Sequence, residues 1–305
     1  MGAMGAMGAM GAMGAMGAMV SVPYASGNQG GNAMRFALCN EVLRALLFAE
    51  QARHAAALGY DALEVAPFTF DAEAPHRLPA ARRAELRRMA EDAGCPIAGL
   101  HWLLVAPAGL SITDAGLHGP TLDVMRGLID LAADLGAGYL VHGSPGQRRV
   151  AAPGDSARAE AALAAAAAHS GAAGLTYVLE PLDPGQTNWA ASLAEAAQIV
   201  QRIGHPALRT MLDVAAAGAG ETESVPDLLR RWLPTGLIAH VHLNDRNRRA
   251  PGQGSDRFAP ILAALHAGGY GGICGVEPFE YIPDGPGSAA RAIGYLRGIE
   301  EGLSA

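Results

Sequence analysis

Residues 175–213 read LTYVLEPLDPGQTNWAASLAEAAQIVQRIGHPALRTMLD, and this stretch indicates how the chain folds. Two short apolar runs, each closed by a carboxylate (Glu180 and Asp213), flank an Ala-rich amphipathic segment over 190–203 that stops at Gly204. Short apolar runs are typical of buried strands, and a glycine directly after an amphipathic segment is typical of a helix end. We therefore predict a strand, a helix and a second, parallel strand in this order.

The same unit recurs along the chain from Arg35 onward. Strands are predicted at 35–39, 62–66, 97–104, 138–142, 175–180, 208–213, 237–243 and 273–277. Helices are predicted at 44–58, 80–93, 120–135, 155–172, 190–203, 224–232, 257–267 and 287–302. Eight strands in strict alternation with eight helices predict an α/β fold, a single (β/α)8 TIM barrel. The alternative, an open doubly wound sheet, would require a glycine-rich turn after the first strand, where the sequence has Asn40-Glu41-Val42-Leu43.

The first residues form a segment of low complexity. Met-Gly-Ala is repeated six times before Met19. The repeat lacks the basic start and the strongly apolar centre of a signal peptide, and it is too rich in glycine to span a membrane. We expect residues 1–33 to be a disordered leader, added to the protein or read from a wrong start, and residues 34–305 to be the TIM-barrel catalytic domain.

Composition restricts the classes of partner. The net charge is -7 and the pI about 5.8, and the few arginine clusters are too short to follow nucleic-acid phosphates. We expect neither a nucleic-acid partner nor a membrane partner. The three cysteines (Cys39, Cys95 and Cys274) are far apart and lack metal-site spacing, so we expect them to be reduced, buried apolar residues of a cytoplasmic protein. No glycine-rich nucleotide-binding loop is present in the sequence.

Polar residues stand where the predicted strands end, and the active site of a TIM barrel lies at that edge. From the second strand to the eighth they are Glu64, His101 with Trp102, His142, Glu180, Asp213, His242 and Glu277. Charged groups at the ends of buried strands are costly unless they are paired or bound to a metal ion. The Glu, Asp, His, Glu series on strands five to eight therefore predicts a site for one moderately hard divalent ion.

Each of these residues also has a simpler interpretation. A strand-end carboxylate fits a helix cap or an arginine partner, and a single strand-end histidine fits core packing. His240 points to the same side as His242 but lies one layer deeper, so we interpret it as packing or as support for the ligand. Four such residues on four consecutive strands favour the metal site over these separate explanations.

The second half of the chain, from about Leu175 to Tyr281, resembles the xylose-isomerase-like TIM-barrel superfamily, and within it the ketose 3-epimerases. The motifs that carry this resemblance are Glu180-Pro181-Leu182, Met211-Leu212-Asp213, His242-Leu243-Asn244-Asp245 with the following arginines and Pro251-Gly252-Gln253-Gly254, and Val276-Glu277-Pro278-Phe279. The first half of the chain matches in architecture alone.

The resemblance implies an enzyme that moves a proton next to the carbonyl of a ketose or related keto-sugar. It implies that Glu180, Asp213, His242 and Glu277 bind one divalent ion, with Mn²⁺ preferred and Mg²⁺ or Co²⁺ as alternatives, which stabilises the enediolate. Glu180 and Glu277 would also be the acid/base pair, and Arg248 would hold substrate oxygens. Replacement substrate contacts are expected from His101, Trp102, His142 and Glu64. A homodimer or homotetramer is expected from the family.

Two departures from the family pattern leave the sugar open. Ala216 stands where the epimerases have a substrate-contacting histidine, and Gln186 stands where they have a second glutamate. A lyase or dehydratase acting on a keto-sugar or inosose is the alternative function, because enolisation is its first step too. A trizinc DNA-repair nuclease would need more ligands than Ala216 and the 252–257 loop supply, and a non-catalytic binding module does not account for the ligand set.

Overall fold

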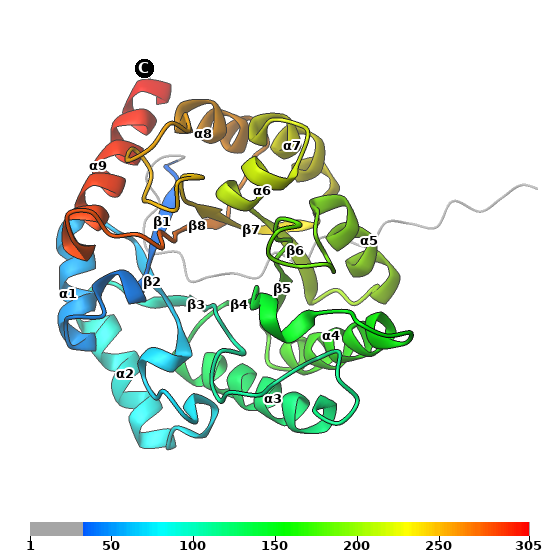
Figure 1. The fold of residues 1–305 in the computed structure, drawn as a ribbon. Coiled ribbons are helices and arrows are strands. Elements are labelled where there is room, and N and C mark those ends of the chain that lie inside the picture. The colour runs from blue at the N-terminus through cyan, green and yellow to red at the C-terminus, as the bar shows by residue number, and fades with distance from the viewer. Residues whose placement is uncertain (1–32, 305) are drawn as a thin grey trace, which may run out of the picture.

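Within residues 33–304, eight strands close into one parallel barrel in the order β1 to β8, and β8 pairs with β1 (Figure 1). A computed structural model describes residues 33–304. The strands are β1 Arg35–Cys39, β2 Ala62–Val65, β3 Ile97–Leu100, β4 Tyr139–His142, β5 Thr176–Leu179, β6 Leu208–Asp213, β7 Ile238–Leu243 and β8 Ile273–Val276. The predicted (β/α)8 barrel is confirmed. The expected leader over 1–33 lies almost wholly outside the described residues.

Helices surround the barrel, and all of them except the last lie between consecutive strands (Figure 1). They are α1 Phe48–Leu58, α2 Ala80–Asp92, α3 His118–Leu135, α4 Asp155–Ala172, α5 Leu193–Ile203, α6 Val214–Gly220, α7 Val225–Trp232, α8 Phe258–Ala267 and α9 Gly285–Ser304. Gly59 and Gly204 end α1 and α5 in the left-handed conformation, as predicted, because glycine lacks the Cβ that makes this conformation costly.

Two predicted boundaries are wrong by four residues and one short helix was missed, each for a local reason. The third strand stops at Leu100 rather than 104, because Trp102 has a φ of 51° and cannot continue an extended chain. The first helix begins at Phe48 rather than 44, because residues 40–43 form a 3-10 turn. The short helix α6 was not predicted, since Val-Ala-Ala-Ala-Gly-Ala-Gly has no amphipathic pattern.

The core is mostly apolar, and buried acidic and histidine side chains gather at the carboxyl ends of the strands. One large cluster joins the strands to the helices, and two smaller clusters consist of strand residues: Ala37, Ala62, Ala98 and Ile273, and then Val141, Val178 and Met211. Tyr139 packs against both small clusters. All three cysteines are free and buried, which confirms their predicted role as apolar residues. Within the described part of the chain, no helix is both long and apolar enough to cross a membrane.

Candidate active site

Four side chains meet at the carboxyl ends of four neighbouring strands. Asp213 is the last residue of β6 and His242 lies on β7, while Glu180 and Glu277 directly follow β5 and β8. One ligand atom from each lies within 4.8 Å of all the others, and all four residues are buried. The structure therefore brings together the set that the sequence analysis singled out, in a group that could hold a metal ion.

His242 presents its Nδ1 atom to the three carboxylates. This atom lies 3.0 Å from Glu277 Oε2, 3.5 Å from Glu180 Oε1 and 3.9 Å from Asp213 Oδ2. It is fully buried, and although it lies within ion-pair distance of Glu277, it makes no hydrogen bond of good geometry among residues 33–304. A buried nitrogen without such a hydrogen bond is costly, and three carboxylate oxygens around it match the ligands that a divalent ion takes. The residues present thus fit a metal ion.

Glu64 holds the opposite side of the His242 ring. Its Oε1 lies 2.9 Å from His242 Nε2, and its Oε2 accepts a hydrogen bond of 2.8 Å from the Tyr139 hydroxyl. Glu64 Oε2 also lies 3.0 Å from His240 Nε2. Burial raises the pKa of the Glu64 carboxyl, but the two histidines outweigh burial and bring it well below its ordinary value. A carboxylate on Nε2 keeps the proton on that nitrogen and leaves Nδ1 free as a ligand.

On β8, the absence of a side chain at Gly275 leaves space for this arrangement. A Cβ atom at Gly275 would lie 2.6 Å from Glu64 Oε2 and 2.8 Å from His242 Cδ2. Any larger side chain at this position would displace the pair that orients the histidine.

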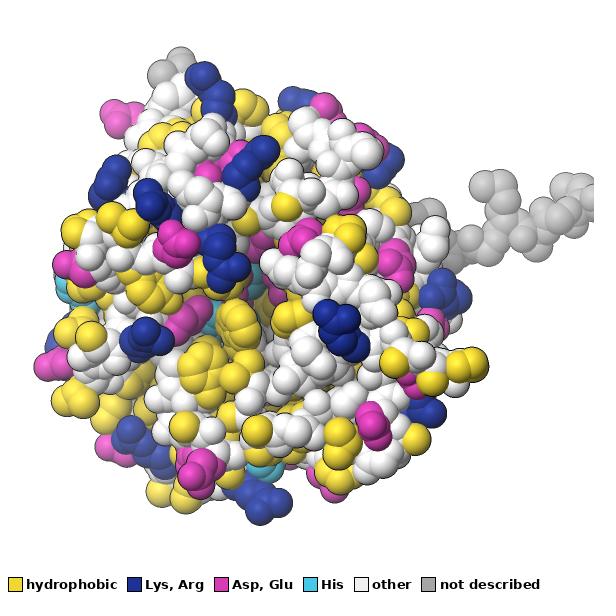
Figure 2. Space-filling view, viewed as in Figure 1, with side chains coloured by type: hydrophobic (Ala, Val, Ile, Leu, Met, Phe, Trp, Pro, Cys, Tyr) yellow, Lys and Arg dark blue, Asp and Glu magenta, His cyan; other side chains and the backbone are white. Residues whose placement is uncertain are grey.

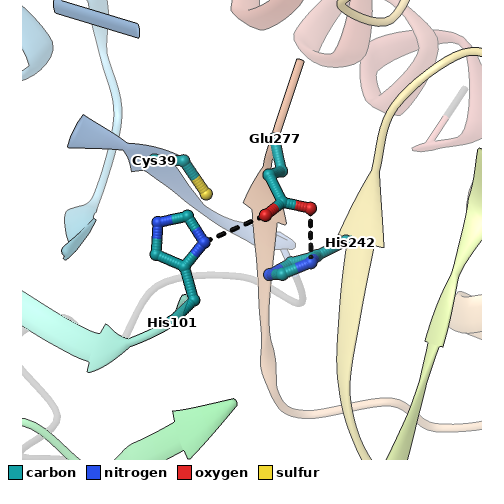
Figure 3. A group of neighbouring side chains, drawn as sticks. All are labelled: Cys39, His101, His242 and Glu277. Carbon is teal, nitrogen blue, oxygen red and sulfur yellow. Dashed lines mark hydrogen bonds and ion pairs between the residues drawn. The ribbon is translucent and has the colours of Figure 1, made fainter. Parts of the chain in front are cut away.

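Glu277 is anchored by two donors from the loop after β3. Its Oε1 lies 3.0 Å from His101 Nδ1 and 3.0 Å from the indole nitrogen of Trp102. Figure 3 shows Glu277 between His101 and His242, with its Oε2 turned toward His242 and with Cys39 beside the same group. His101 Nε2 lies 3.0 Å from Glu41 Oε2, so the imidazole joins two carboxylates. One oxygen of Glu277 is therefore fixed by the protein and the other faces the site.

Asp213 is positioned by backbone and side-chain donors. Its Oδ1 accepts from the Ala216 backbone N–H at 2.7 Å, as the cap of α6, and its Oδ2 accepts from Asn244 Nδ2 at 2.7 Å. Burial, and then the negative charges of Glu180 and Glu277, raise the pKa of Asp213 to about 7. Three buried carboxylates at this spacing repel one another, and a bound cation would offset that repulsion.

The carboxylate of Glu180 is held less firmly than that of Glu277. It lies 3.5 Å from His242 Nδ1, whereas Glu277 contacts His101 and Trp102 at 3.0 Å in addition to His242. Arg148 instead donates to the Glu180 backbone carbonyl at 2.6 Å. A Cβ atom at Gly143 would overlap Glu180 Oε2, so glycine there leaves room for the carboxylate. The Glu180 carboxylate therefore has fewer protein contacts than that of Glu277.

A pocket of about 400 Å³ lies above the four residues. Glu180, Asp213 and Glu277 line its acidic end, together with His101 and Trp102. Arg248 also lines it, with its guanidinium carbon 4.9 Å from the centre of the Phe279 ring. Figure 2 shows a hollow at the centre of this face, where acidic and histidine side chains lie among hydrophobic ones. An acidic floor beneath partly aromatic walls suits a small polar organic molecule.

Comparison with known proteins assigns the chain to a protein family. The model of the family described as Xylose isomerase-like TIM barrel matches residues 52–299. The chain belongs to this family.

Relatives of this xylose isomerase-like barrel are similar over most of its length. It is 23% identical to fructoselysine 3-epimerase of Escherichia coli O157:H7 over 246 residues, 78% of this chain and 88% of the relative. A crystal structure of D-psicose 3-epimerase in the presence of D-fructose has a TM-score of 0.73 at 22% identity, covering 87% of this chain and 99% of that one. The apo 3-keto-D-glucoside 4-epimerase of E. coli has a TM-score of 0.73 at 18% identity, covering 87% of this chain and all of that one. These findings confirm the predicted family resemblance, and the names support an enzyme of the sugar isomerase and epimerase type.

Two residues predicted to contact substrate lie elsewhere in this xylose isomerase-like barrel. Glu64 has no exposed surface and does not line the pocket, because its carboxylate is used by His242, His240 and Tyr139. His142 is also absent from the pocket wall. Its Nδ1 pairs with the Tyr177 hydroxyl at 2.8 Å, and burial, with a smaller contribution from Arg148, lowers the pKa of His142 to about 3.

Four residues around the site were missed by the sequence analysis. Glu41 follows the end of β1, so a search of strand ends extended to the first strand would have found it. Asn244 stands inside the His242-Leu243-Asn244-Asp245 motif, which was noticed without a role for the amide. Arg246 and Phe279 line the pocket, and only their place in strand-following loops pointed to it.

Proposed function

We propose that this chain is a metal-dependent isomerase or epimerase of a ketose or related keto-sugar. The observation that carries the proposal is the convergence of Glu180, Asp213, His242 and Glu277 on one buried point at the floor of the pocket, with His242 Nδ1 among them without a hydrogen bond of good geometry. These four residues would bind one divalent ion, and Mn²⁺ is the ion we propose.

Glu180 and Glu277 would act as the acid/base pair. Their carboxylates approach the same point from β5 and β8, so a sugar carbon between them presents one face to each. Glu180, as a carboxylate, would take a proton from the carbon next to the carbonyl, and Glu277, in its protonated form, would give its proton to the opposite face, so that the two carboxyl groups exchange protonation states. This exchange inverts the carbon, whereas return of the proton to the neighbouring carbon would interconvert ketose and aldose.

A divalent ion bound by this set would polarise the substrate carbonyl and stabilise the negative charge that proton removal leaves on the oxygens. The chain's own residues would position the substrate and the acid/base pair. His101 and Trp102 hold Glu277 Oε1, so that Oε2 faces the reacting carbon. Arg248, which lies over Phe279 at the pocket wall, would hold substrate oxygens. Trp102 lines the pocket and offers a flat apolar surface to the sugar.

The names of the relatives support this assignment. Fructoselysine, D-psicose and 3-keto-D-glucosides are all keto-sugars, and the three relatives invert a carbon of such a sugar according to their names. We further propose a cytoplasmic location, from the reduced buried cysteines, and assembly as a homodimer or homotetramer, from the family resemblance.

Deuterium exchange tests the reaction type. The Mn²⁺-loaded protein is incubated in deuterated water with D-fructose, D-psicose or a 3-keto-glucoside, and NMR follows each carbon. We expect deuterium to enter next to the carbonyl with the sugar's atoms otherwise retained. Glu180→Gln should bind the ion through its amide oxygen and lose exchange. Loss of water from the sugar would establish the lyase instead, and no exchange with any keto-sugar in the loaded protein would contradict both.

A further inference from the structure

The pocket is chemically divided. Charged side chains concentrate at the floor, whereas one wall is formed by Ala215, Ala216 and Ala219 of α6, with Leu182 from the loop after β5. Ala215 and Ala219 are four residues apart, so they lie on the same face of α6. Methyl groups neither donate nor accept hydrogen bonds, so these four side chains offer only an apolar surface, and the polar side chains of Asp183 and Gln186 line the pocket near them.

A second part of the pocket lining is aromatic. Trp102 and Phe279 both line it, and their ring centres are 6.2 Å apart in an edge-to-face arrangement. The Trp102 indole N–H is already used by Glu277, so its ring presents carbon atoms to the pocket. Arg246 and Arg248 also line the pocket, and Asp256 binds the Nε and the backbone N–H of Arg246. Most of the surface that lines the pocket is nevertheless apolar.

A free ketose fits the floor better than it fits these walls. Nearly every carbon of a free sugar carries a hydroxyl group, and a hydroxyl that is buried against methyl groups loses its hydrogen bonds to water without replacement. The volume of about 400 Å³ falls in the range of about 300–1,000 Å³ typical of pockets that hold drug-sized organic molecules. There is space for a second group beside the sugar.

We propose that the substrate is a keto-sugar in which an organic substituent replaces one hydroxyl or hydroxyl hydrogen, and that this substituent lies between the α6 alanines and the Trp102–Phe279 side. The inference rests on the proposed function, since the reacting end of the sugar must reach the carboxylates. The substituent would bury apolar surface against the α6 alanines. It would also take the place of a hydroxyl group for which this wall has no hydrogen-bond partner.

Paired substrates test the proposal. The rate of deuterium incorporation per unit substrate concentration, kcat/KM, is measured for D-fructose and for 1-deoxyfructose carrying an N-phenyl or N-butyl amine at carbon 1. Phenyl 3-keto-glucoside tests a glycosidic link in place of the amine. We expect at least one substituted sugar to exceed the free ketose about 10-fold or more, the discrimination that one or a few apolar groups give in a fitted pocket.

Two variants test where in the pocket the substituent lies. Ala219→Leu fills the space along the α6 wall and should reduce the preference for the substituted sugar several-fold, while Ala165→Leu, on the exposed side of α4, makes the same change away from the pocket and should leave the preference as it is. A free ketose that reacts as fast as all the substituted sugars would overturn the inference and leave the proposed function intact. A preference that Ala219→Leu does not alter would overturn the placement, and exchange with none of the sugars would instead count against the proposed function.

Discussion

Glu64→Gln is the change that isolates how the protein orients its histidine ligand. Glu64 is fully buried, and its carboxylate lies 2.9 Å from His242 Nε2 and 3.0 Å from His240 Nε2. Glutamine has nearly the same shape but no charge, so the ring loses the partner that keeps its proton on Nε2. Nδ1 must be free of a proton to bind a cation, so the loss of the Glu64 charge should weaken metal binding.

The expected magnitude follows from the role of such partners. Loss of a residue that orients a metal ligand typically weakens binding about 10- to 100-fold. Since a factor of ten corresponds to about 1.4 kcal/mol, we expect a loss of about 1.4–2.8 kcal/mol in the binding free energy of Mn²⁺. Titration calorimetry on metal-free protein measures the affinity directly. Nitrogen NMR of the metal-free protein should also show less of the His242 tautomer protonated at Nε2.

A matched control separates this effect from general damage. Glu300 is 7% exposed and accepts hydrogen bonds from Arg297 and from the backbone N–H of Met34, next to the amino end of β1 and away from the carboxyl ends of the strands that carry the ligands. Glu300→Gln should lower thermal stability without changing Mn²⁺ affinity. If Glu64→Gln binds Mn²⁺ as tightly as the unaltered protein, or if Glu300→Gln weakens binding equally, the reasoning about His242 is refuted.

Three further changes test other parts of the structure. Gly143→Ala places a methyl group on Glu180 Oε2, so we expect kcat to fall about 10-fold or more with a weaker metal site, measured by exchange kinetics and metal titration; unchanged kinetics would show that Glu180 adjusts freely. Trp102→Phe removes the N–H that fixes Glu277 Oε1 and should reduce kcat about 10- to 100-fold with bound metal retained, as expected when a hydrogen bond to a charged group is lost; an equal loss of metal would indicate a structural role. Backbone N–H groups of Ala151 and Ala152 lower the pKa of Asp155, so its stabilisation is present above the ordinary carboxyl pKa and is lost as the pH falls through the lowered one. Asp155→Asn should therefore lower Tm at pH 7 and matter less at pH 3, and a Tm difference that does not shrink would contradict this account.

The barrel and the set of metal-ligand candidates could be predicted because both show as local patterns in the sequence. A buried strand shows as an apolar run, and its carboxyl end shows as the first charged residue after it, as in the run that ends at Glu180. Because parallel strands in a closed barrel bring all these ends to one face, the sequence predicts a meeting point without any distance.

The parts that could not be predicted depend on which neighbours a side chain meets. Glu64 and Glu180 both end short buried strands, but only the fold places Glu64 against the histidines of β7 and Glu180 at the pocket. His142 likewise has the sequence context of a site residue, and its hydrogen bond to Tyr177 is visible only in the structure. Helix α6 was missed because it is formed by small residues, and those residues shape the pocket wall.

The most direct test of the account is the number of metal ions bound per chain, compared with the same count for Asp213→Asn and for His242→Leu. The account predicts one tightly bound Mn²⁺ per chain in the unaltered protein. His242→Leu should lose it and Asp213→Asn should bind it much more weakly, while both variants keep the barrel's circular dichroism. Full metal content in a folded His242→Leu protein, or three ions per chain in the unaltered one, would contradict a single ion held by Glu180, Asp213, His242 and Glu277.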